Sequence, residues 1–242
     1  MKSMQFPARI LCIVTIFSIA MGFLESAVVV YMREILYPDG FDFPLAPIEI
    51  NLAVTEIIRE AVTLIMLLII GILAGRTATE RFAWFLLSFA VWDIFYYIFL
   101  KLLIGWPESL LTWDILFLIP VTWVGPVISP VIVAFTMIFL SITLIYYSYK
   151  AGRVRIKGLE WGIFIFGSVI LILAWTWDYS GYILEHYNFS EIWTIPKDDL
   201  YSLATQYIPR KFSWGLFLLG EGIILSGILL VFLKVKNLKL GR

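Results

Sequence analysis

The sequence predicts an all-α integral membrane protein, a bundle of six transmembrane helices that form three outward-opening hairpins with short interfacial helices in the outer loops. Three observations predict this class. Of the 242 residues, 61% are hydrophobic and only 15% are charged, and the mean hydropathy is +0.93, values outside the range of soluble domains. Six apolar runs are each long enough to cross about 30 Å of hydrocarbon, which takes roughly 20 residues. Lysine and arginine recur on alternate connections between these runs, as expected of a multi-pass topology.

The six runs are interpreted as one membrane domain that covers residues 1–242. The first run is interpreted as a span and not as a signal peptide, because its apolar stretch resumes after Glu25 and continues to Met32 without a convincing cleavage site. The predicted spans are approximately 8–34, 49–75, 81–103, 126–149, 158–183 and 211–233.

Prolines define the predicted elements between the spans. Two outer segments run from proline to proline over the same length, 107–120 and 196–209. Because proline suits the start of a helix and stops one at its end, interfacial helices are predicted at about 107–119 and 196–208. A Trp-Asp pair precedes each segment, at Asp93 and at Asp178. A diverged tandem repeat and coincidence in an aromatic-rich chain both explain this similarity.

The distribution of basic residues predicts the orientation. Lysine and arginine concentrate at positions 2–9, 76–81, 150–157 and 234–242, whereas the intervening connections are rich in acidic and aromatic residues. By the positive-inside rule the basic segments face the cytoplasm. The expected location is therefore the plasma or inner membrane, with both termini cytoplasmic.

Composition excludes several classes of function. The 18 basic and 18 acidic residues balance, so no global positive field attracts nucleic acid. One cysteine, Cys12, and one histidine, His186, argue against zinc and bis-histidine haem sites. No nucleotide-binding fingerprint occurs in a supporting context. A hard divalent cation stays among the alternatives, because its ligands are carboxylates.

Acidic residues inside the spans are the candidate functional residues. Each costs about 2.5–3.5 kcal/mol in hydrocarbon unless it is paired or faces a polar cavity. Counting 1.5 Å per residue, five spans place a carboxylate in the outer half of the membrane. The candidate ligands for a cation are Glu25, Glu60, Asp93 and Glu221, and a metal, if present, would be held by Glu25, Asp93 and Glu221. The supporting candidates are Glu56, Arg59, Asp178, Tyr97, Tyr182 and Asp114.

Some charged residues have a structural interpretation. Glu56 and Arg59 lie at i and i+3 and are expected to pair on one helix face. Arg33, Lys101 and Asp178 are expected at the membrane interface, where long basic side chains extend toward water.

Three functions stay open from the sequence. The first is an acidic intramembrane cavity, open to the extracytoplasmic side, that binds or transports a proton, a cation or a small cationic solute. The second is an enzyme that acts on a lipid or lipid-linked substrate at the outer leaflet, with a carboxyl as general acid and Arg59 or Lys211 as phosphate anchor. The third is a structural or assembly subunit. The expected partners are the bilayer, a small cation or lipid ligand, and a homo-oligomer or membrane-complex partner.

Two glycine pairs have the spacing that permits close helix approach. Gly71 and Gly75 lie in the second span, and Gly158 and Gly162 lie in the fifth. Packing alone explains both pairs.

Overall fold

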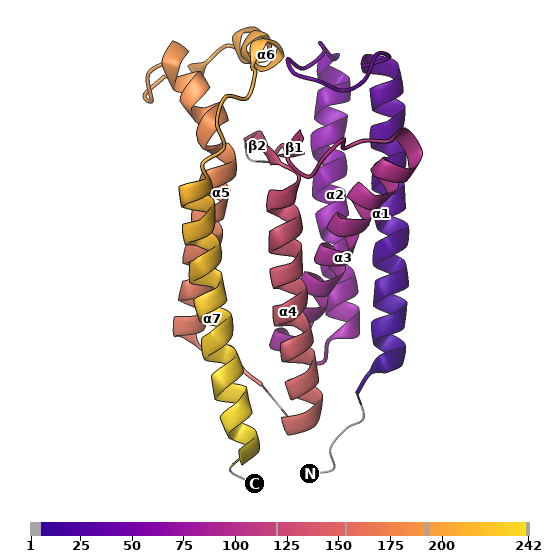
Figure 1. Cartoon of the computed structure of the whole chain (residues 1–242), viewed down its shortest axis with the longest axis vertical. Helices are drawn as coiled ribbons and strands as arrows, with labels where there is room; N and C mark the ends of the chain where they lie inside the picture. Colours follow the sequence, from indigo (N-terminus) through magenta and orange to yellow (C-terminus); the bar gives the residue numbers. More distant parts are fainter. Residues whose placement is uncertain (1–5, 120, 153, 192–193, 241–242) are drawn as a thin grey trace.

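The computed structural model describes residues 6–119, 121–152, 154–191 and 194–240, and in these ranges it contains seven helices and a two-stranded β-hairpin (Figure 1). Six helices are long and apolar enough to cross a membrane. The predicted all-α membrane bundle is confirmed, and most helices extend a few residues beyond the predicted spans. The long helices are α1 (Ala8–Leu36), α2 (Ile50–Ala74), α3 (Ala78–Ile104), α4 (Ile128–Ala151), α5 (Gly158–His186) and α7 (Trp214–Leu240).

The ends of α3 show how local chemistry sets a helix boundary. The Thr77 side chain accepts a hydrogen bond from the Glu80 backbone N–H at 3.3 Å and caps the first turn. Gly105, with φ of 72°, ends the helix in the left-handed conformation that glycine adopts without steric cost. The Lys101 ammonium, exposed as expected for an interfacial residue, donates to the Gly105 carbonyl at 2.8 Å.

The long helices form two units. Helices α1, α2 and α4 pack around α3, and α5 pairs with α7 (Figure 1). Gly167 of α5 and Gly220 of α7 allow the second pair to approach closely, because an added Cβ at Gly220 would lie 3.0 Å from the Gly167 carbonyl oxygen. The two units meet chiefly where α4 contacts α7 and where α5 contacts the β-hairpin.

The segment predicted as a helix at 107–119 is instead part of the hairpin. Strand β1 (Trp113–Phe117) pairs antiparallel with β2 (Trp123–Pro126). The prediction was wrong because prolines were taken as helix limits, whereas the residues of β1 are mostly aromatic or aliphatic and have a partner strand that satisfies their backbone. The second predicted helix, 196–208, is observed as α6 (Lys197–Gln206).

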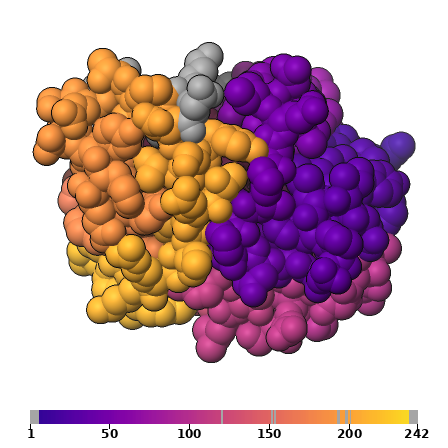
Figure 2. All heavy atoms as spheres, turned by 90° about the horizontal axis from the view of Figure 1, so that it is seen from above, coloured from indigo at the N-terminus to yellow at the C-terminus, as the bar shows by residue number. Residues whose placement is uncertain are grey.

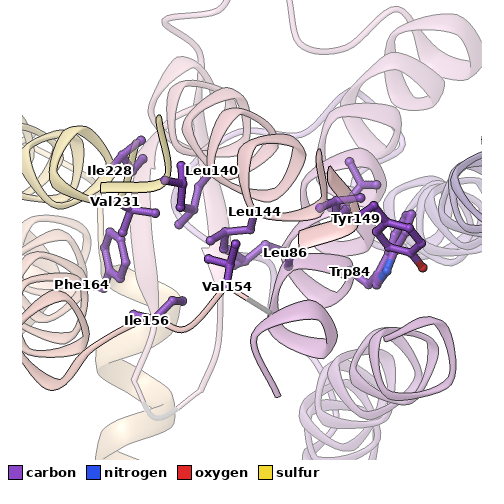
Figure 3. Packing of buried hydrophobic residues seen from close by; sticks show 14 of the residues in the cluster. Trp84, Leu86, Leu140, Leu144, Tyr149, Val154, Ile156, Phe164, Ile228 and Val231 are labelled. Carbon is purple, nitrogen blue, oxygen red and sulfur yellow. The ribbon is translucent and has the colours of Figure 1, made fainter. Parts of the chain in front are cut away.

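The largest hydrophobic core lies where α3, α4, α5 and α7 meet. Trp84, Leu144 and Val231 are almost completely buried in it, and Figure 3 shows the two units interlocking there through Leu140, Phe164 and other apolar side chains. These apolar contacts therefore join the two helical units.

The bundle has two chemically different ends. We call the end that holds both termini the basic end (Figure 1), since the α2–α3 connection, the α4–α5 connection and the C-terminal part of α7 lie there and carry Arg76, Arg155 and Lys234. We call the other the loop end. Viewed from the loop end, the connection 37–49 abuts the α6 region (Figure 2), and the rings of Phe43 and Tyr207 lie 6.2 Å apart across this contact.

Candidate functional site

A cavity of about 280 Å³ lies near the loop end, between α1, α2, α3 and β1 and against the 37–49 connection and α6. We call it the loop-end cavity. Its lining combines carboxylates and guanidiniums with apolar and aromatic side chains. The charged lining residues are Glu25, Glu56, Glu60, Asp93, Asp114, Arg33 and Arg59.

Arg59 pairs with two of these carboxylates. It forms ion pairs with Glu56 on its own helix, as the spacing predicted, and with Glu25 of α1. The Thr63 hydroxyl donates a further hydrogen bond to Glu25 at 3.2 Å. Arg59 therefore links α1 to α2, and Glu25 obtains the partner from another helix that its apolar surroundings require.

Arg33 neutralises a third carboxylate. Its Nη2 lies 3.2 Å from Oδ1 of Asp114, and Arg33 and Asp114 are only 8% and 2% exposed. The guanidinium also stacks on Trp106, with 3.7 Å from Cζ to the ring centroid, and Tyr97 donates to Asp114 at 3.2 Å. The expectation that Arg33 extends to the membrane interface was wrong, because the hairpin brings a buried carboxylate and an aromatic face to it.

Asp114 lies outside the six spanning helices. Burial raises the pKa of its carboxyl to about 6, while the Arg33 guanidinium acts in the opposite direction. The carboxyl is therefore mostly ionised at neutral pH, as the ion pair requires.

Two lining carboxylates, Glu60 and Asp93, form no ion pair with any residue that the structure describes, although Arg59 also acts on Glu60 at longer range. Glu60 accepts a hydrogen bond from the Leu118 backbone N–H at 3.0 Å but forms no ion pair with any residue that the structure describes. The Asp93 carboxylate makes neither a hydrogen bond nor an ion pair within the described part of the chain. Five acidic groups and two arginines line the cavity, so the lining has a formal excess of three negative charges when all of them are ionised.

Glu221 does not join this cavity. It lies on α7, where Oε1 accepts a hydrogen bond from the Thr136 hydroxyl, and Oε2 is buried without a partner among the described residues. The structure therefore brings together Glu25, Glu60 and Asp93 but not Glu221. In the described ranges no group of three or more His, Cys, Asp or Glu side chains is arranged to hold a metal ion, so Glu25, Asp93 and Glu221 do not form a ligand set.

Asp178 has a structural role in the α5–α7 connection. Its carboxylate accepts hydrogen bonds from the Tyr207 hydroxyl at 2.7 Å and from the Arg210 and Lys211 backbone N–H groups at 3.0 and 3.2 Å. Burial and this carboxylate together raise the pKa of the Tyr207 hydroxyl. Asp178 thus orders a loop and does not line the cavity.

The two Trp-Asp segments are not equivalent in space. Trp92 is buried and lines the loop-end cavity, whereas Trp177 is 60% exposed. Tyr182 packs its ring 5.4 Å from that of Tyr207, and the exposed His186 ends α5. A common role for the two segments has no structural support, since one precedes a strand and the other a helix.

Apart from Tyr97, the aromatic residues of the site were not among the candidates. Trp92 and Tyr96 of α3 and Phe117 of β1 line the cavity beside the carboxylates, and the rings of Trp92 and Tyr96 stack at 6.5 Å. In a chain with ten tryptophans and twelve tyrosines, aromatic residues near a span end are typical of interfacial belts. Only their position beside Asp93 in the structure distinguishes these residues from the aromatic residues of an interfacial belt.

The fold and the site define a six-helix membrane protein with a charged, aromatic-lined cavity near one end of the bundle. Comparisons with protein-family models, with curated proteins and with solved structures find no match for the chain.

Proposed function

We propose that this protein binds a small organic cation in the loop-end cavity and transports it across the plasma or inner membrane. The observation that carries the proposal is that Asp93 lines this cavity without a cationic partner among the described residues, beside Glu60, which forms no ion pair with them. A carboxylate in such surroundings needs a proton, a metal or a cationic solute to offset the cost of its burial.

The surroundings of Asp93 favour an organic cation over a bare metal ion. Trp92, Tyr96 and Tyr97 line the same cavity, and aromatic faces attract ammonium groups through the ring quadrupole, by about 0.5–2 kcal/mol each. Hard metal ions instead require several oxygen ligands together. The aromatic lining therefore matches a substituted ammonium group.

The distribution of basic residues supports uptake from the extracytoplasmic side. Arg76, Arg155 and Lys234 lie at the basic end, which by the positive-inside rule faces the cytoplasm. The loop-end cavity lies toward the opposite side of the bundle. A cation would then reach Glu60 and Asp93 between the 37–49 connection and α6.

Calorimetric binding of choline to the purified protein tests this proposal. Unit charges 4 Å apart at an effective dielectric constant of 20 attract by about 4 kcal/mol, so we expect Asp93→Asn and Glu60→Gln each to weaken binding at least about tenfold, which corresponds to about 1.4 kcal/mol. The uncharged isostere of choline, in which carbon replaces the quaternary nitrogen, is expected to bind far more weakly than choline to the unmodified protein.

Glu34→Gln is the matched control, because Glu34 is exposed near the end of α1 and does not line the loop-end cavity. It removes the same charge and should leave the affinity unchanged. Equal affinities for choline and its isostere, or equal weakening by Glu34→Gln and Asp93→Asn, would contradict the proposal. A folding yield that falls in both cavity variants, with no choline binding by the unmodified protein, would instead support an assembly subunit.

A further inference from the structure

A second cavity, of about 310 Å³, lies between α3 and α4 on one side and the α5–α7 pair on the other. We call it the apolar cavity. Its walls are aliphatic and aromatic side chains from both helical units, and among the described residues that line it Asp93 alone carries a charge. It is therefore suited to hydrocarbon and not to a hydrated ion.

The apolar cavity adjoins the loop-end cavity around Asp93. Trp92, Asp93, Leu116 and Phe117 line both. Asp93 thus stands at the boundary between a cavity with an excess of acidic groups and a cavity whose described lining contains no other charged residue.

One face of α3 runs along both cavities. Phe82, Leu86, Phe89 and Asp93 follow one another at spacings of four, three and four residues and line the apolar cavity, as expected for a single helix face. Tyr97, four residues further along, lines the loop-end cavity. The surface of α3 therefore changes from hydrocarbon to acidic and hydroxyl-bearing groups at Asp93.

We propose that the solute is an amphipathic cation, with its ammonium group beside Asp93 and Glu60 in the loop-end cavity and its hydrocarbon part in the apolar cavity. This inference rests on the proposed function and narrows its substrate class. Each cavity alone is near the lower limit of about 300 Å³ for ligand pockets, and the two together lie well inside the typical range.

Neither simpler ligand uses both cavities. A small hydrophilic cation would compensate Asp93 but leave the apolar walls without a partner. An uncharged hydrocarbon would fill the apolar cavity but leave Asp93 at its boundary as an uncompensated carboxylate, which is costly in a medium of low dielectric constant. A ligand that carries both an ammonium group and a hydrocarbon chain would compensate Asp93 and also fill the apolar cavity. Such a ligand explains why Asp93 lies where the two cavities meet.

A series of trimethylammonium ions with one alkyl chain from methyl to octyl tests the inference. Binding is measured to the full-length protein in lipid nanodiscs, after subtraction of binding to protein-free nanodiscs. Burial of each methylene contributes up to about 0.8 kcal/mol, so we expect affinity to rise by up to about fourfold per added methylene until the apolar cavity is filled. Octyl sulfate, with the same chain and the opposite charge, is expected not to compete.

Two variants that fill the apolar cavity test whether the hydrocarbon chain and the ammonium group bind in different cavities. Ser168 and Ile172 of α5 line the apolar cavity and not the loop-end cavity. Ser168→Phe and Ile172→Trp should abolish the dependence on chain length while leaving tetramethylammonium binding unchanged. Val169→Phe is the matched control, because Val169 is 47% exposed on the same helix and lines neither cavity.

The outcomes distinguish this inference from the proposed function. The inference of an amphipathic ligand is contradicted if tetramethylammonium binds but the affinity of the series does not depend on chain length. It is also contradicted if that dependence persists in both Ser168→Phe and Ile172→Trp. In either case the proposed site for a small cation is still supported. If tetramethylammonium does not bind at all, the proposed function fails. A free amphiphile and a lipid can both supply an ammonium group joined to a hydrocarbon chain. Stronger competition by lysophosphatidylcholine than by octyltrimethylammonium would indicate that the ligand is a lipid.

Discussion

Arg33→Met is expected to lower the free energy of unfolding by about 3–5 kcal/mol, because it leaves the buried Asp114 carboxylate without its counter-charge. The variant also loses the stacking of the guanidinium on Trp106. Equilibrium unfolding in detergent, followed by tryptophan fluorescence, measures the change. The double variant Arg33→Met/Asp114→Asn should regain much of the lost stability, since the unpaired charge is then absent and Tyr97 can still donate to the amide oxygen.

Arg210→Met is the control for an exposed ion pair. Arg210 lies 2.6 Å from Glu185, but their side chains are 61% and 52% exposed. Solvent screens such surface pairs, so the loss should be much smaller than that of Arg33→Met. Equal losses for Arg33→Met and Arg210→Met would show that Arg33 is not part of a buried ion pair.

Gly71→Ala and Gly162→Ala are expected to change stability in opposite directions. Both glycines lie inside long helices. A Cβ on Gly71 would lie 2.7 Å from the Arg81 carbonyl oxygen and 2.7 Å from the Phe85 backbone nitrogen, so α2 and α3 would have to separate. We expect a loss of about 1–3 kcal/mol or more.

A Cβ on Gly162 would meet open space. Alanine there gains helix propensity, and we expect a gain of about 0.5–1 kcal/mol. The same unfolding measurement checks both variants. A neutral Gly71→Ala would mean that α2 and α3 do not make the close contact. The two variants also distinguish two sequence patterns of equal spacing. Gly71 and Gly75 pack against α3, whereas a Cβ added at Gly158 or Gly162 would meet no atom of the described residues within 4 Å.

The sequence by itself determined the six spanning helices. In hydrocarbon every backbone polar group must be satisfied within the chain, so an apolar run of about 20 residues has little choice but to form a helix. It also determined contacts within one helix, such as Glu56 with Arg59, since three residues nearly complete one turn. The hairpin at β1 was missed because its strands depend on each other and on Arg33 of a distant helix.

Only the tertiary structure decided which charges on different helices meet. Residue counting along a span gives the depth of Glu25, Glu60, Asp93 or Glu221 in the membrane, because each residue adds 1.5 Å of rise. It does not give the direction in which each side chain points around the helix axis. In a helix of a soluble protein, an apolar stripe shows which side faces the core. In a membrane protein the lipid and the protein core are equally apolar, so the hydrophobic periodicity of a helix is weak. Helix rotation and packing therefore placed Glu25, Glu60 and Asp93 around one cavity and left Glu221 with Thr136.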